Sequence, residues 1–289
     1  MKKIINNKLL SVLLIVFIYL LALVGGIFVY KYFVDLDFWL KLLIADIAST
    51  IIVFIFSILL KNASVYDPYW SVQPFVIVLA VMINYPINLP IILIFSVITL
   101  WAFRLTMNWL YTFYNLNYED WRYKLLKDKT KYFYPIINFI GIHMVPTLVV
   151  YLCTLPACYL IINNSSLNVF TILGFIISML AIVLEFFADM QMHRYKKNKK
   201  LNKVDYIFIR DGLWKYSRHP NYLGEILMWY GIAFISLSSI NDYLFFTGAI
   251  CNTLLFICVS IPMAEKKQSK KEGFFEYKNA TRYLLPFKK

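Results

Sequence analysis

The chain has 289 residues, of which 61% are hydrophobic and 16% charged, and its mean hydropathy is +0.64. This composition excludes a single water-soluble core and predicts an all-α, polytopic integral membrane protein with seven to eight transmembrane helices. The formal net charge of +13 is gathered in basic clusters, which the positive-inside rule assigns to the cytoplasmic side. Because a basic surface beside a bilayer attracts anionic lipid, we expect membrane lipid as a partner and no nucleic acid.

Eight apolar segments follow one another along the chain, and each is interpreted as a membrane span. They are residues 9–30, 38–60, 72–83, 90–114, 134–162, 169–189, 221–239 and 244–263. The first is long enough to cross about 30 Å of hydrocarbon, so we interpret it as a retained helix and not as a removed signal. Pro135, Pro146 and Pro156 predict bends in the fifth segment. An even number of spans places both termini on the cytoplasmic side, together with the basic clusters.

The cysteines and histidines give no indication of a metal site. The 4 cysteines lie in apolar segments without a Cys-x-x-Cys motif, and there are only 3 histidines, so we expect neither a metal nor a disulfide framework. A Gly-x-Gly-x-x-Gly motif is also absent from the sequence. Any dinucleotide would therefore bind among membrane helices and not in a Rossmann domain.

Ionisable side chains at membrane depth are costly, so they mark candidate functional sites. Glu185 and Asp189 are four residues apart near the end of the sixth segment, and Arg194 and Lys196 follow them. One interpretation is a salt-bridge cluster at the membrane interface. The other is a binding site for a phosphate-bearing cofactor, because arginine in particular suits phosphate.

A polar stretch, residues 212–225, lies before the seventh segment. Pro220 lacks an N–H and has a fixed φ, which predicts the first turn of a helix there. Asn221 and Glu225 are four residues apart and would share one face of this helix, where Gly224 permits close approach. This face is predicted to bind a polar group.

The side chains of this stretch are candidate ligand contacts. Arg218, whose planar guanidinium suits phosphate, could clamp a phosphate, and Asn221 could form hydrogen bonds to a carboxamide or a ribose. We expect Glu225 to orient Asn221 or Arg218.

Residues 212–225 resemble the nicotinamide-cofactor signature of the membrane-bound steroid 5-alpha-reductase family, in particular of its bacterial branch. The motif reads Gly-Leu-Trp…Arg-His-Pro-Asn-Tyr-Leu-Gly-Glu. Residues 277–287 are similar to the C-terminal ending of that family, and residues 66–71 and 119–123 are similar to signatures of the bacterial branch. Sterol reductases and isoprenylcysteine-type methyltransferases share parts of the Arg-His-Pro region.

The resemblance implies an oxidoreductase that acts on CH–CH groups, similar to a 3-oxo-5-alpha-steroid 4-dehydrogenase. Such an enzyme transfers hydride from NADPH to the conjugated double bond of a lipophilic enone, such as a 3-oxo-4-ene steroid, which enters from the bilayer. The residues implied to bind the cofactor are Glu185, Asp189, Arg194, Lys196, Arg218, His219, Asn221, Tyr222, Glu225, Glu265, Lys266, Tyr277 and Arg282. No repeat or linker divides the chain, so we expect one transmembrane domain over residues 1–289, with an additional N-terminal helix in residues 1–37 and a cofactor-binding core in residues 180–289.

The resemblance also implies an acid and a tyrosine that polarise the 3-oxo group of the substrate. Asp67 corresponds to the acid, Tyr66 or Tyr69 takes the place of the tyrosine, and Arg104 inside the fourth segment completes the catalytic group. A carboxylic acid with a raised pKa could donate a proton to a developing enolate oxygen. The alternative for Asp67 is a turn between helices.

Two other functions stay open at this point. The first is an S-adenosylmethionine-dependent methyltransferase of a lipid or a prenylated thiol, which predicts a neutral aromatic pocket for the sulfonium. The second is a non-catalytic lipid-binding membrane protein.

Overall fold

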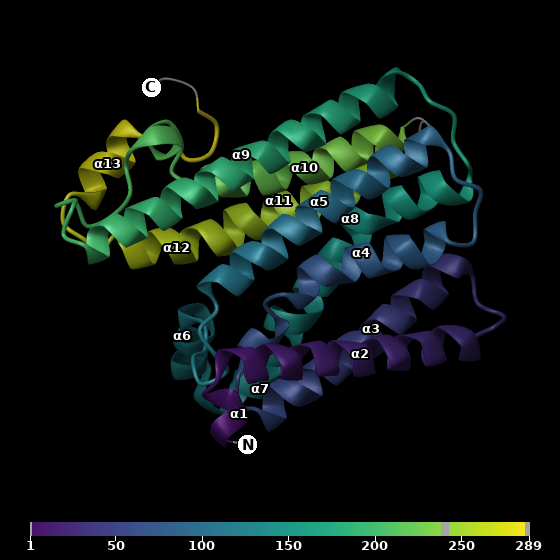
Figure 1. Ribbon diagram of the computed structural model, residues 1–289, viewed down its shortest axis with the longest axis horizontal. Coiled ribbons are helices and arrows are strands. Elements are labelled where there is room, and N and C mark those ends of the chain that lie inside the picture. The colour runs from purple at the N-terminus through teal and green to yellow at the C-terminus, as the bar shows by residue number, and fades with distance from the viewer. Residues whose placement is uncertain (1, 238–242, 287–289) are drawn as a thin grey trace. The chain divides into compact units, whose positions relative to one another are not determined.

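The computed structural model describes residues 2–237 and 243–286, and these residues form an all-α protein (Figure 1). Within these described residues, six helical stretches are long and apolar enough to cross a membrane. They are α2 (Lys8–Tyr32), α3 (Phe38–Leu59), α5 (Leu89–Thr112), the run Trp121–Ile162, α9 (Val169–Lys200) and the run Phe246–Gln268. The prediction of a polytopic integral membrane protein is therefore confirmed.

The two remaining apolar segments of the sequence form shorter helices. They are α4 (Tyr69–Met82), with 14 residues, and α10 (Pro220–Ser236), with 17 residues. The prediction that a helix begins at Pro220 is confirmed. The predicted end of the seventh segment at Ser239, and the turn after it, lie outside the described residues.

Each of the two runs consists of several elements. The run Trp121–Ile162 comprises α6 (Trp121–Thr130), η2 (Lys131–Phe133), α7 (Tyr134–Ile137), η3 (Asn138–Met144) and α8 (Val145–Ile162), and the run Phe246–Gln268 comprises α11 (Phe246–Leu255), η6 (Phe256–Ser260) and α12 (Ile261–Gln268). The remaining short elements are α1 (Lys2–Ile5), η1 (Ala63–Tyr66), η4 (Gly212–Lys215), η5 (Tyr243–Phe245) and α13 (Phe274–Ala280).

Two of these elements are stretches of π-helix, η3 and η6, and each ends two residues before a proline, Pro146 or Pro262. Proline cannot donate to the carbonyl four residues before it, and its ring crowds that carbonyl. A wider turn at this point relieves the crowding and keeps the helix continuous.

The chain divides into two compact units, which are described separately. Unit 1 comprises Met1–Val76 and Leu105–Tyr151, and unit 2 comprises Ile77–Arg104 and Leu152–Lys289. In unit 1, α2 packs on α3, and a core that includes Ile18, Val53 and Tyr66 is closed to solvent. Burying these large apolar side chains is the main favourable term for this unit.

In unit 2, α9 and α10 lie side by side (Figure 1) because small residues face each other along both helices. A Cβ atom added to Gly231 would lie 2.8 Å from the carbonyl oxygen of Gly174, and one added to Gly224 would lie 2.3 Å from Cγ of Glu185. Small residues of this kind let membrane helices approach closely. The close approach also presses Glu185 against the first turns of α10.

Candidate functional site

A buried cluster of one arginine and three acids lies in unit 2. Arg104 on α5 forms ion pairs through Nη1 with Asp189 Oδ2 at 2.7 Å and through Nη2 with Glu185 Oε2 at 3.0 Å. Its Nη2 also lies 3.8 Å from Glu225 Oε2 on α10. The structure thus brings together three of the predicted cofactor residues, Glu185, Asp189 and Glu225, with one predicted catalytic residue, Arg104. We name this group the acid cluster.

Two indoles hold Glu225 in place. Trp229 Nε1 donates to Oε1 and Trp101 Nε1 donates to Oε2, each at 2.8 Å. The two rings meet edge to face, with centroids 4.9 Å apart. The partners of Glu225 in the structure are Trp101, Trp229 and Arg104, and not Asn221 or Arg218 as the sequence had suggested.

Sequence reasoning had not predicted that Trp101 and Trp229 donate to Glu225. Trp229 is four residues after Glu225, and Trp101 is three residues before Arg104. In each case the helical spacing places the indole on the same face as the charged residue. This spacing was the signal that could have found them.

The acid cluster has more carboxylates than guanidinium groups. Within residues 2–237 and 243–286, Arg104 Nε has no hydrogen-bond partner, and no group of His, Cys, Asp and Glu side chains is arranged to hold a metal ion. Like charges close together in a dry site disfavour full ionisation. The cluster can therefore either retain protons or accept a cationic group from a ligand.

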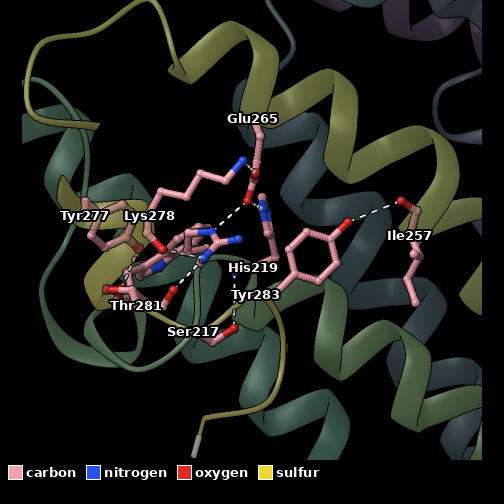
Figure 2. A network of polar contacts seen from close by, with 10 residues as sticks. Ser217, His219, Ile257, Glu265, Tyr277, Lys278, Thr281 and Tyr283 are labelled. Atoms are coloured by element: carbon pink, nitrogen blue, oxygen red, sulfur yellow. Dashed lines mark hydrogen bonds and ion pairs between the residues drawn. The ribbon is translucent and has the colours of Figure 1, made fainter. Parts of the chain in front are cut away.

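A second cluster surrounds Arg218, just before α10 (Figure 2). Its Nε donates to Glu265 Oε1 at 2.7 Å, and its Nη1 donates to the carbonyl oxygens of Lys278, at 3.0 Å, and Thr281. Its backbone N–H donates to the carbonyl of Arg282 at 2.9 Å. Arg218 thus holds residues 274–286, the C-terminal segment, against the start of α10. Arg218 was predicted to clamp a phosphate, but its Nε and Nη1 already have partners within the protein.

Aromatic rings and one histidine surround these contacts of Arg218. His219 Nε2 lies 3.4 Å from Glu265 Oε1, and its ring stacks on Tyr222 with centroids 5.4 Å apart. Burial lowers the pKa of His219 below its ordinary value, against the opposite effect of Glu265. Tyr277 donates to the carbonyl of Trp214 at 2.6 Å (Figure 2).

The other predicted cofactor residues lie at the surface. Asn221 is partly exposed at the start of α10, and in the described part of the chain its side chain has no hydrogen-bond partner. It is therefore available to a ligand. The remaining side chains, all exposed cations, are Arg194, Lys196, Lys266 and Arg282.

Three of the predicted catalytic residues, Tyr66, Asp67 and Tyr69, lie in unit 1 at η1 and the start of α4. Tyr123 Oη donates to Asp67 Oδ1 at 2.6 Å. Burial raises the pKa of Asp67 to about 6, although Arg122 and Tyr123 oppose this effect. Asp67 can therefore carry a proton at mildly acidic pH. The fourth predicted catalytic residue, Arg104, belongs to unit 2.

Comparison with known proteins gives the family but no activity. An uncharacterized protein of Schizosaccharomyces pombe is 27% identical over 254 residues, which cover 76% of this chain and 74% of the relative. No solved structure matches the chain. Residues 53–281 match the sequence profile of DUF1295, which is described as a protein of unknown function, and this range includes the acid cluster, Arg218 and Asp67. The chain therefore belongs to the DUF1295 family of membrane proteins.

Proposed function

We propose that the protein is an NADPH-dependent membrane reductase that transfers hydride to the conjugated double bond of a lipophilic enone, such as a 3-oxo-4-ene steroid. One observation carries the proposal. Glu225, the last residue of the stretch that resembles the reductase signature, lies in one buried cluster with Glu185, Asp189 and Arg104. This is the stretch in which a nicotinamide cofactor is expected.

The residues of unit 2 fit such a cofactor in two respects. When bound, NADPH would supply the hydride, and its nicotinamide ring would become positively charged. Glu185 and Glu225 are 2% and 3% exposed, and carboxylates fixed in a dry site stabilise a developing positive charge. Asn221, with its free amide, would bind the carboxamide or the ribose.

Asp67 is the acid that we propose for the oxo group of the substrate. A carboxyl group with a pKa of about 6 retains protons that an ordinary aspartate would have lost. It can therefore donate a proton as negative charge develops on the oxygen of the enone. Tyr123 donates to Oδ1, and the hydrogen bonds from Tyr123 and Ser64 would stabilise the carboxylate that remains after the proton is transferred.

The topology follows from the basic clusters. We propose that α4 and α10 also cross the membrane, which gives eight spans with both termini and the cofactor residues on the cytoplasmic side. The exposed cations Arg194 and Lys196 at the end of α9 would then meet cytosolic NADPH, whose phosphates they attract.

The methyltransferase is the second candidate. It predicts a neutral aromatic pocket, and Trp101 and Trp229 supply the aromatic part. The three carboxylates beside one guanidinium make the cluster acidic and not neutral, which favours the reductase. An acidic cluster would still attract a sulfonium, so the experiment has to compare both cofactors.

The test is thermal unfolding of the detergent-purified protein with NADPH or with S-adenosylmethionine. A ligand at 100 times its Kd stabilises the native state by about 2.7 kcal/mol. We expect NADPH alone to raise the Tm, and Asn221→Ala to reduce this effect. Asn163→Ala, the same exchange at an exposed residue of unit 2, should leave it unchanged. Stabilisation by S-adenosylmethionine alone would support the methyltransferase, and stabilisation by neither would favour a non-catalytic lipid-binding protein.

A further inference from the structure

Unit 1 contains a second group of buried polar atoms, on an element that the proposed function does not use. This element is the π-helix η3, where Asn138 and His143 are 2% and 0% exposed. The Asn138 amide contacts Ser57 at 3.1 Å, and the His143 ring lies 5.4 Å from that of Phe54. Ser57 and Phe54 are three residues apart on α3 and share one face. Both side chains of η3 therefore point to the same face of α3.

The hydrogen bonds around Ser57 fix the orientation of the Asn138 amide. Ser57 Oγ donates its one proton to the carbonyl of Phe54 at 2.8 Å, so it can only accept from Asn138 Nδ2. Asn138 Oδ1 then faces away from Ser57. It is a buried acceptor without a hydrogen-bond partner among the described residues.

The tautomer of His143 follows in the same way. His143 Nδ1 lies 2.9 Å from the carbonyl oxygen of Asn138. Because a carbonyl oxygen only accepts, Nδ1 carries the proton, and Nε2 of the neutral ring is a bare acceptor. Nε2 is also buried and has no partner in the part of the chain that the structure describes. Asn138 and His143 on η3 thus present two buried acceptors that lack a donor among the described residues.

The surroundings of these acceptors are aromatic. The His143 ring packs against Tyr66, with centroids 4.7 Å apart, as well as against Phe54. The Tyr66 hydroxyl is itself engaged with Thr147 Oγ1 at 2.8 Å. Apolar walls with a few placed polar atoms are typical of small-molecule sites. A buried acceptor left without a donor is destabilising, so a ligand that supplies the donor stabilises the fold.

We propose that this face of η3 binds the hydroxyl group of a lipophilic alcohol. The O–H has one proton, which it donates to either His143 Nε2 or Asn138 Oδ1. A hydroxyl is favoured over an ammonium, because a charged group at membrane depth is costly. The proposal is independent of the reductase activity, since it concerns an equilibrium binding site whose residues lie within unit 1.

The test compares 1-dodecanol with dodecyl methyl ether, which has a similar apolar chain but no donor. We expect the alcohol to raise the Tm of the detergent-purified protein by several degrees more than the ether does. His143→Phe keeps a flat ring and loses Nε2, and Asn138→Leu loses Oδ1, so each variant should reduce this difference. His193→Phe makes the same exchange as the first variant in unit 2 and should retain the full difference.

Equal shifts with the alcohol and the ether in the wild-type protein would mean that water alone fills the site, and would overturn the proposal. The proposal would also be overturned if neither compound shifted the Tm of the wild-type protein. A difference that is undiminished in both His143→Phe and Asn138→Leu would overturn it as well. If one of these variants does not fold, the other still decides the question, because each removes one of the two acceptors.

Discussion

The stability of the protein should be sensitive to the loss of one acceptor oxygen of Glu225. Both of its carboxylate oxygens accept an indole N–H, from Trp101 and from Trp229, at 2.8 Å. In Glu225→Gln the side chain keeps its volume but has one oxygen and one amino group. In either orientation of the amide, one indole N–H then faces another donor. A buried donor without a partner costs about 1–3 kcal/mol.

Glu225→Gln also removes one of three neighbouring carboxylates, which relieves repulsion with Glu185. A double-mutant cycle with Trp229→Phe separates the two effects, because the relief of charge is common to both backgrounds. In the Trp229→Phe protein the amino group of the glutamine can face the phenyl ring, and its oxygen can still accept from Trp101. We therefore expect Glu225→Gln to cost about 1–3 kcal/mol less in that background.

The assay is the free energy of unfolding in mixed detergent micelles, measured for the wild-type protein, the two single variants and the double variant. Glu276→Gln is the matched control, because Glu276 is exposed on α13. It should change the free energy of unfolding by no more than about 0.5 kcal/mol. Additive effects of the two substitutions, within about 0.5 kcal/mol, would refute the argument from the two indole donors.

Three further predictions concern other parts of the chain. Because burial raises the pKa of Asp67 to about 6 from 3.8, the folded state binds more protons than the unfolded state, and stability should fall as the pH rises through this window. In Asp67→Asn the Tm should lack this pH-dependent contribution over the same range. If the Tm of the variant and of the wild type fell in parallel with pH, Asp67 would not be the titrating group. Gly231→Ala should destabilise the protein by about 1–3 kcal/mol, because its Cβ would lie 2.8 Å from the carbonyl of Gly174. Gly141→Ala, whose Cβ would meet only a methyl group at 3.8 Å, is the control, and equal losses in Tm would rule out the packing argument. Arg218→Ala should release the C-terminal segment and accelerate its cleavage by proteinase K several-fold. An unchanged rate would show that the contacts of Arg218 do not hold this segment in place.

The membrane spans could be predicted from the sequence because the requirement that defines them is local. A run of about 20 apolar residues is visible without any knowledge of what the helix contacts. The end of the sixth segment was predicted at Asp189, but α9 continues to Lys200. Lysine and arginine have good helix propensity, so the helix extends beyond the apolar run. Hydropathy therefore located the membrane crossing, but the helix itself is longer.

The site could be predicted only where its residues lie close together in the chain. Glu185 and Asp189 are one turn apart on α9, and Glu225 and Trp229 are one turn apart on α10. Their common partner, Arg104, lies 81 residues before Glu185, and no local pattern connects the two. The same limit applies to Arg218, whose partner Glu265 is 47 residues away. Helical spacing gives the face on which a residue lies, but the partner of that face depends on how the helices pack.

The energetics of the acid cluster support the proposal that it binds a ligand. Burying an ion pair costs several kcal/mol of desolvation per ion, and well-packed apolar residues of similar volume are often as stable or more stable. Here Arg104 faces three carboxylates, so their mutual repulsion adds to this cost. The glycines that bring α10 against α9 also fix Glu185 beside Gly224. The geometry of the cluster is thus fixed by packing and by two indole donors, and such a buried group is suited to a charged ligand that completes it.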